Sequence, residues 1–172
     1  MCQPKVFCLT EPAPNPSPSV TLLPGSPFAG KARAIESGEW AGWYQWDGTD
    51  PFEETSGPFY FAHDTTGLIT GFRPGAKNRN GHGMIHGGAL MTFADFSLFM
   101  IAATAQGEDV NGVTVTMTSE FLSPAQAGEL LICRGERTGG GRSLIIARGV
   151  ITADDRPVLG FSGVIRQFRK NA

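Results

Sequence analysis

The chain has 172 residues, a formal net charge of −2 and a sequence pI near 5.9. Its composition is 41% hydrophobic and 17% charged, which suits one domain with a substantial core and excludes disorder along the whole chain. The Lys and Arg residues are scattered rather than clustered, so the sequence predicts no nucleic-acid-binding surface. An anionic ligand would therefore have to be bound by a few groups at its own site and not by an extended basic surface.

The cysteines and the apolar segments predict a cytoplasmic protein that does not enter a membrane. Cys2, Cys8 and Cys133 form neither an even disulfide framework nor a CxxC pair, as is typical of a reducing compartment. No apolar run near the N-terminus is long enough for a signal peptide. The longest apolar segment, Ala94 to Ala105, contains Asp95 and is short for a membrane span.

The first 57 residues differ in composition from the rest. Seven of the twelve prolines fall in residues 1–27, which predicts a disordered or extended arm. We interpret residues 28–57 as a helical and aromatic extension, with a short helix over Phe28 to Ser37. Residues 58–172 would form the main domain.

All three tryptophans lie in this extension, at Trp40, Trp43 and Trp46. A spacing of three suits one face of a helical turn. The favoured interpretation is that these rings cover an edge of the core, because aromatic stripes usually pack. The alternative is a lid over an acyl-binding site.

The main domain contains short segments with strand patterns on both sides of one long apolar segment. Hairpin turns are expected at Asp64 to Gly67, at the glycines 139–141 and at Asp154-Asp155. In the clearest strand, valines, Met117 and Phe121 alternate with threonines, which predicts a half-buried strand. The six predicted strands are Pro58–His63, Leu68–Phe72, Val113–Phe121, Glu129–Arg137, Ser143–Thr152 and Pro157–Phe168.

A helix is predicted from about Gly87 to Ala105, between the two groups of strands. It is apolar nearly all the way round, which is typical of a buried helix. Strands before and after one buried helix indicate an α+β fold in which the sheet curls around that helix.

Asp95 is the single charged residue of this helix. A buried carboxylate costs several kcal/mol unless it is paired or hydrogen-bonded, so it is a candidate functional group. The alternatives are that Asp95 faces water or a partner subunit, or that it caps a neighbouring backbone segment.

The start of the helix provides a second candidate group. Gly83 to Gly88 lead into it, and the free amides of a first helical turn can hold an oxyanion. Gly88 and Asp95 are about 10 Å apart along the axis at 1.5 Å per residue. Because reacting atoms need to come within about 3 to 3.5 Å, we infer a site shared between two subunits of a symmetric dimer.

Four segments, Asn80 to Gly88, Asp95, Gly112 to Val115 and Phe121 to Ala125, resemble the PaaI-type (phenylacetic acid degradation) branch of the hot-dog-fold thioesterases. The resemblance covers about Gly57 to Phe168. It implies a long central helix wrapped by a curved antiparallel sheet of about six strands. It also implies homodimers or homotetramers that hydrolyse acyl-CoA at the dimer interface, without a metal or redox cofactor.

Carried over by position, the resemblance gives roles to individual residues. Asp95 would be the nucleophile or general base, and the Gly87 and Gly88 amides would polarise the thioester carbonyl. Asn80 and His86 would orient the substrate and water.

Two further residues are candidates for the site, and one pair of histidines is considered as a metal site. Thr114 falls where this branch often has a small hydroxyl residue near the attacking water. Arg142, after the glycine turn, is a candidate contact for the CoA phosphates. His82 and His86 have the spacing of two metal ligands on a helix face, but the glycines predict a loop and no third ligand is evident, so no metal is expected.

Two other functions stay open. One is a hot-dog hydratase or dehydratase acting on enoyl thioesters, and the other is a noncatalytic module that binds acyl-CoA. The sequence does not decide the acyl group, or between a dimer and a tetramer, or between the nucleophilic and general-base routes for Asp95.

Overall fold

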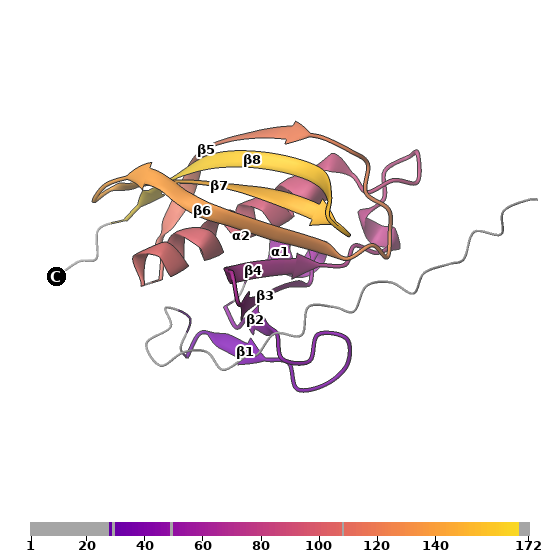
Figure 1. Ribbon diagram of the computed structural model, residues 1–172, viewed down its shortest axis with the longest axis horizontal. Coiled ribbons are helices and arrows are strands. Elements are labelled where there is room, and N and C mark those ends of the chain that lie inside the picture. The colour runs from indigo at the N-terminus through magenta and orange to yellow at the C-terminus, as the bar shows by residue number, and fades with distance from the viewer. Residues whose placement is uncertain (1–27, 29, 49, 108, 169–172) are drawn as a thin grey trace, which may run out of the picture.

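The computed structural model describes residues 28, 30–48, 50–107 and 109–168. The predicted arm 1–27 lies outside these residues. One antiparallel sheet curves around a long helix, with the strand order β1-β2-β3-β4-β6-β7-β8-β5. The sheet arches over one side of the helix, and the N-terminal strands continue it below (Figure 1).

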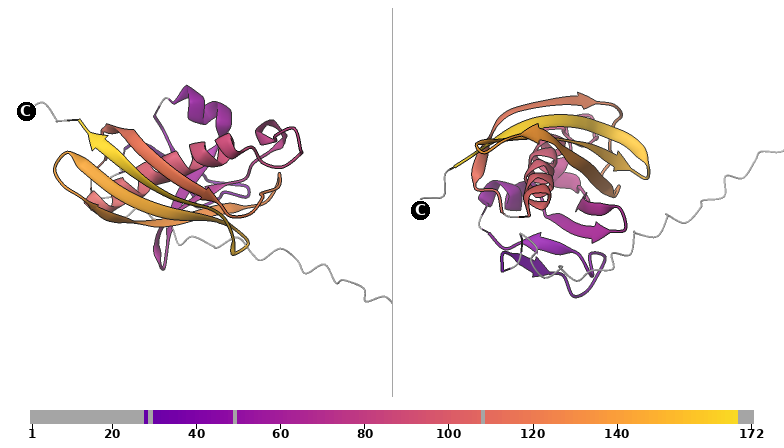
Figure 2. Two further views of the ribbon diagram at one scale, coloured as in Figure 1. Left: turned by 90° about the horizontal axis from the view of Figure 1, so that it is seen from above. Right: turned by 60° about the vertical axis from the view of Figure 1, so that its left-hand side comes forward.

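The helices are α1 (Pro51–Ser56) and α2 (Gly87–Gln106), with a short 3-10 helix η1 (Ala76–Asn78). Four strands precede α2: β1 (Ala32–Ala34), β2 (Tyr44–Trp46), β3 (Phe59–Asp64) and β4 (Gly67–Phe72). Four longer strands follow it: β5 (Gly112–Phe121), β6 (Leu131–Gly140), β7 (Leu144–Ala153) and β8 (Arg156–Gln167). The end-on view in Figure 2 shows α2 enclosed by these strands.

This arrangement confirms the predicted hot-dog fold and its central helix. The sheet has eight strands rather than about six, because the N-terminal extension contributes β1 and β2. The predicted helix over Phe28 to Ser37 is therefore wrong. The chain reverses between β1 and β2 through Gly38 and Gly42, whose positive φ angles of 82° and 85° suit a tight loop and not a helix.

Trp40 and Trp43 lie in this reversal rather than on a helical turn. Trp43 is fully buried, and its ring meets that of Trp40 edge-on with centroids 5.0 Å apart. Trp40 also stacks on Tyr60 of β3 at 4.1 Å. The two rings cover Gly71 of β4, where an added Cβ would come within 2.6 Å of Trp40. The interpretation that these rings cover an edge of the core is confirmed for this pair.

Helix α2 is the centre of the core. Most of its side chains are buried, and Phe93 packs against Phe59 and Phe72 with ring centroids 5.4 Å from each. At 20 residues, α2 is long and apolar enough to cross a membrane by composition alone, contrary to the prediction that no segment is. In this fold the sheet covers the apolar surface of α2, so burial in the core accounts for its apolar composition.

Strand β5 is an edge of the sheet and departs from its predicted pattern. Its pairing with β8 is interrupted by a bulge between Thr114 and Thr116, which changes the side-chain alternation. The predicted buried face is therefore wrong at Val113 and Val115, which are 46% and 48% exposed. It is also wrong at Phe121, which is 57% exposed at the end of the strand. Thr114, placed on the polar face in the prediction, faces α2.

The two predicted turns after α2 are present. Gly140 has a φ of 105° in the β6–β7 turn. Asp154 and Asp155, with φ of 46° and 66°, form the two-residue β7–β8 turn in the left-handed conformation that such hairpins need.

Candidate active site

Asp95 lies midway along α2 and is half-buried. Its Oδ1 accepts a hydrogen bond of 2.6 Å from the Thr114 hydroxyl of β5. Burial raises the pKa of Asp95, and the carboxylate of Asp50 raises it further, while the Thr114 hydrogen bond opposes both. One carboxylate oxygen is thus held by a hydroxyl group.

A cavity of about 490 Å³ opens beside Asp95. Thr114 and Asp95 form part of one wall, and the next two turns of α2 add Phe96, Phe99 and Met100. This volume lies within the range of about 300 to 1,000 Å³ that is usual for small-molecule sites. The cavity is large enough to hold an apolar group attached to a reacting carbonyl.

The N-terminal extension supplies further lining residues of this cavity. Phe28, Trp46, Asp50 and Glu53 line the cavity together with Asp95. Trp46 therefore lines the cavity beside Asp95, whereas Trp40 and Trp43 belong to the core. Sequence analysis did not select Phe28, Asp50 or Glu53 as site residues.

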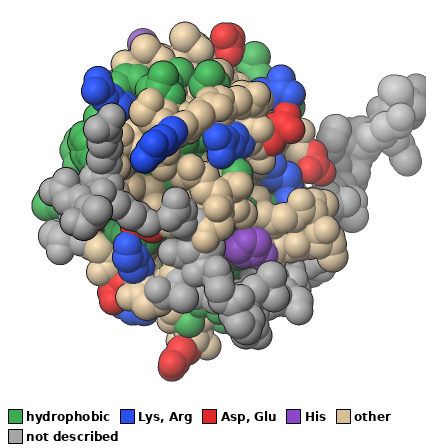
Figure 3. Space-filling view, turned by 90° about the vertical axis from the view of Figure 1, so that its left-hand side faces the viewer, with side chains coloured by type: hydrophobic (Ala, Val, Ile, Leu, Met, Phe, Trp, Pro, Cys, Tyr) green, Lys and Arg blue, Asp and Glu red, His purple; other side chains and the backbone are tan. Residues whose placement is uncertain are grey.

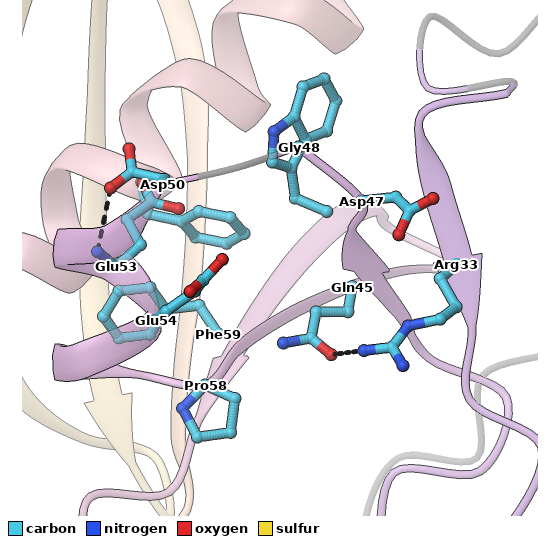
Figure 4. Close-up of a pocket in the computed structure, with 11 residues that line it drawn as sticks. Arg33, Gln45, Asp47, Gly48, Asp50, Glu53, Glu54, Pro58 and Phe59 are labelled. Carbon is cyan, nitrogen blue, oxygen red and sulfur yellow. Dashed lines mark hydrogen bonds between the residues drawn. The ribbon is translucent and has the colours of Figure 1, made fainter.

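Helix α1 holds Glu53 in place. Asp50 caps it, since its Oδ1 accepts hydrogen bonds from the backbone amides of Phe52 at 3.2 Å and Glu53 at 3.0 Å. Figure 4 shows the bond to the Glu53 amide. Burial, then Asp50, then Asp95, raise the pKa of Glu53 to about 7. An Asp followed by Pro51 and an acidic first turn is a helix-start signal that could have predicted this short helix.

The other candidate group is the start of α2. His86 is the N-cap, and its Nδ1 accepts a hydrogen bond of 2.8 Å from the Gly88 amide. This bond leaves the imidazole proton on Nε2, where it can be donated outward. The Gly88 amide is engaged and not free as expected, whereas the Gly87 amide donates to no acceptor among the described residues.

Two asparagines shape the loop before α2. Asn80 Oδ1 accepts from the amides of His82 at 2.9 Å and Met84 at 3.2 Å. Asn78, which sequence analysis missed, is buried. Its backbone carbonyl oxygen accepts a hydrogen bond of 2.8 Å from the His86 amide. Asn78 therefore fixes the backbone of the N-cap, and Asn80 fixes the loop.

Within one chain, the two candidate groups line different cavities. Asn80 and Gly87 line a groove of about 370 Å³ that also contacts Phe121, and neither lines the cavity of Asp95 and Thr114. The structure brings together the residues of each group. It does not bring the groups to each other, in keeping with their two-turn separation on α2.

Arg142 and His82 lie apart from these groups. Arg142 is exposed in the β6–β7 turn and lines neither the Asp95 cavity nor the groove at Gly87. His82 lies in the loop organised by Asn80, so His82 and His86 do not share a helix face. On the face at the left-hand end of Figure 1, basic and acidic side chains are interspersed (Figure 3).

Cys133 can be excluded as a nucleophile. It is buried under α2 beside Thr70 and Ser97, and burial raises the pKa of its thiol to about 12. A thiol with that pKa is almost entirely protonated at neutral pH, and the thiolate is the reactive form.

One family model matches the central part of the chain. Residues 82–159 match the family described as the thioesterase superfamily. This match covers less than half of the chain, so the matched part is similar to the thioesterase superfamily. This confirms the predicted class of enzyme, a thioesterase. The superfamily match covers α2 with its N-cap and the strands β5 to β7, and leaves β1, β2 and α1 outside it.

Solved structures share the fold of this chain. The PaaI protein from the phenylacetic acid degradation operon of E. coli is 21% identical, with 72% of this chain and 88% of that chain covered at a TM-score of 0.61. A hypothetical thioesterase from Streptococcus pneumoniae TIGR4, solved with coenzyme A, is 20% identical over 61% and 83% of the two chains, with a TM-score of 0.54.

Zebra fish thioesterase superfamily member 2 is 19% identical over 64% of this chain and 81% of that chain, with a TM-score of 0.56. No curated protein matches the chain significantly.

Proposed function

We propose that this chain hydrolyses acyl-CoA thioesters to a free acid and CoA, with Asp95 as the catalytic carboxylate, at a site shared by two subunits. The observation that carries this proposal is the Asp95–Thr114 hydrogen bond at the wall of a cavity lined by acidic and apolar side chains. A thioester suits these few groups, because its carbonyl is electrophilic and its thiolate leaves without a strong general acid.

Asp95 acts in its ionised form in either of two routes. As a general base it takes a proton from water while the water oxygen attacks the carbonyl carbon. As a nucleophile it attacks that carbon itself, and water then hydrolyses the mixed anhydride. In both routes the carbon–sulfur bond breaks and the thiolate of CoA is protonated. Because the Thr114 hydroxyl holds Oδ1, Oδ2 remains for the water or the carbonyl carbon.

The start of α2 stabilises the oxyanion. The Gly87 amide at the positive end of the helix dipole is the principal donor, and the Gly88 amide adds to it when substrate displaces its bond to His86. His86, with its proton on Nε2, and Asn80 orient the substrate and the water. Arg142 remains a proposed contact for a CoA phosphate.

The two halves of this machinery meet across a two-fold axis. An interface is supported by the open edge of β5 and by its exposed apolar side chains Val113, Val115 and Phe121, with Phe121 57% exposed. Two copies that pair along this edge form one interface in a symmetric homodimer, and homotetramers would need a second interface.

The comparisons support the substrate class. A structural neighbour contains coenzyme A, and another is a PaaI protein, so we place this chain in the PaaI-type branch. The composition supports a cytoplasmic location, and the proposed chemistry uses no metal or redox cofactor.

Thiol release from a panel of acyl-CoA substrates tests this function. Asp95→Asn keeps the size of the side chain and removes its charge, and we expect kcat to fall at least about a hundredfold. Asp155→Asn, in the exposed β7–β8 turn, is the matched control and should retain wild-type turnover. Near-normal turnover by Asp95→Asn would refute the role of Asp95. Formation of an enoyl product would favour a hydratase or dehydratase. Tight binding of acyl-CoA without thiol release would favour a noncatalytic module.

A further inference from the structure

The cavity beside Asp95 has an unusual distribution of charge. Its ionisable lining residues among the described part of the chain are all acidic: Asp50, Glu53, Asp95 and Asp109. Asp109 is paired with Lys31, but no Lys or Arg of the described residues lines the cavity itself. The remaining walls are largely apolar, with Phe28, Trp46, Phe96, Phe99, Met100 and Val110.

Glu53 differs from the other three acids. Asp50 is used by the α1 cap, Asp95 accepts from Thr114, and Asp109 accepts from Lys31. Across the described residues, no donor bonds to the Glu53 carboxyl group and no cation pairs with it. Glu53 also lies where two cavities adjoin, since it lines both the Asp95 cavity and a neighbouring one of about 320 Å³.

We propose that Glu53 is a specificity-determining residue, which makes the Asp95 cavity accept uncharged acyl groups and reject acyl groups that end in a carboxylate. This inference rests on the proposed thioesterase function. The acyl chain would extend from the carbonyl at Asp95 along the apolar wall toward Trp46 and α1. A terminal carboxylate there would meet Asp50 and Glu53 in a partly desolvated cavity that no Lys or Arg of the described residues lines, and like charges at such a place repel strongly.

The rejection should depend on pH. The pKa of Glu53 is about 7, so its charge develops between mildly acidic and mildly alkaline solution. The groups that face it are Asp50 at its own helix cap, Asp95 on α2 and Asp109 after α2. The other charged groups that line the neighbouring cavity are Arg33 of β1, Asp47 and Glu54 (Figure 4). Arg33 donates a hydrogen bond of 2.6 Å to the side chain of Gln45.

The test compares acyl-CoA substrates of equal length with and without a terminal carboxylate: butyryl- with succinyl-CoA, and hexanoyl- with adipoyl-CoA. For each pair the readout is the ratio of kcat/KM for the uncharged to the charged substrate. In the wild type we expect this ratio to rise at least about fivefold from about pH 6 to about pH 8.5. In Glu53→Gln the ratio should no longer change with pH, and near pH 8.5 it should be at least about tenfold lower than in the wild type.

Glu54→Gln is the matched control, because Glu54 is the next residue of α1, is exposed and does not line the Asp95 cavity. It should keep the wild-type ratio and its pH dependence. The inference is overturned if Glu53→Gln keeps the wild-type ratio, or if the wild type hydrolyses both members of each pair equally well.

A failure of the proposed function is distinguishable from a failure of this inference. If the wild type releases thiol from no acyl-CoA, the proposed function fails. Calorimetric binding of non-hydrolysable thioether analogues of hexanoyl- and adipoyl-CoA then decides the inference. Tighter binding of the uncharged analogue by the wild type, lost in Glu53→Gln, supports selection by Glu53, and equal affinities refute it.

Discussion

Replacing Thr114 by Val tests how Asp95 is tuned. The substitution removes the hydroxyl that donates to Asp95 Oδ1 at 2.6 Å and keeps the shape of the side chain. Hydrogen bonds to charged groups contribute about 1.5 to 3 kcal/mol, and one pKa unit corresponds to 1.36 kcal/mol. Because this bond lowers the pKa of Asp95 against the effect of burial, its loss should raise that pKa further.

The assay is the pH profile of kcat/KM for the best acyl-CoA substrate. Asp95 is active when ionised, so activity rises with pH through the pKa of Asp95. In Thr114→Val the acidic limb should move to higher pH, and activity on that limb should fall about tenfold or more, since the lost bond contributes about 1.5 to 3 kcal/mol and 1.36 kcal/mol is tenfold. Thr114→Ser keeps a hydroxyl and should keep the wild-type limb. An unshifted limb in Thr114→Val would refute the reasoning.

Three further predictions concern the frame around the site. Gly71→Ala places a Cβ within 2.6 Å of the Trp40 ring and should cost about 1 to 3 kcal/mol in denaturant unfolding, whereas Gly81→Ala, with open space, should not. Asn78→Ala removes the hydrogen bonds of that buried side chain to the backbone of Gly75 and Ser56. We expect the free energy of unfolding to fall by about 1 to 3 kcal/mol, and to change little in the exposed control Asn111→Ala. The pKa of Glu53 is raised in the fold from 4.5 to about 7, so its contribution to stability is present below about pH 4.5 and is lost as pH rises through 7. Glu53→Gln should therefore melt a few degrees above the wild type at alkaline pH, and less so or not at all at pH 5; a pH-independent difference would contradict this.

The main domain could be predicted because its signals are local. Turn residues separate its strands, and the apolar helix with one carboxylate needs no tertiary information to be recognised. The predicted strands after Gly57 all occur, with ends shifted by a few residues. The extension could not be predicted in the same way, because β1 and β2 are short strands that form by pairing with each other and with Phe61 of β3.

Part of the candidate site could also be predicted, because some of its residues give local signals in the sequence. Asp95 and the glycines stand out in the sequence, and the position of Thr114 followed from the resemblance. The bulge that turns Thr114 toward Asp95 has no sequence signal of its own. Glu53 and Phe28 enter the cavity through tertiary packing of a segment far from α2 in the chain, which a motif does not report.

The claim on which the account depends is that Asp95 of one subunit serves the helix start of the other. Gly87→Pro removes one amide at the first helical position, where proline is tolerated, and Gly87→Ala is its control, because it adds a Cβ near Phe121 but keeps the amide. We expect Gly87→Pro and Asp95→Asn each to be inactive alone.

Co-expression of the two inactive chains with different tags decides the claim. In a symmetric dimer with shared sites, each mixed dimer has one site with both lesions and one site with none, so an unfractionated mixture should regain about a quarter of wild-type turnover. Mixed dimers isolated by both tags should regain about half. If isolated mixed dimers stay as inactive as their parents, each site lies within one chain and the account is contradicted.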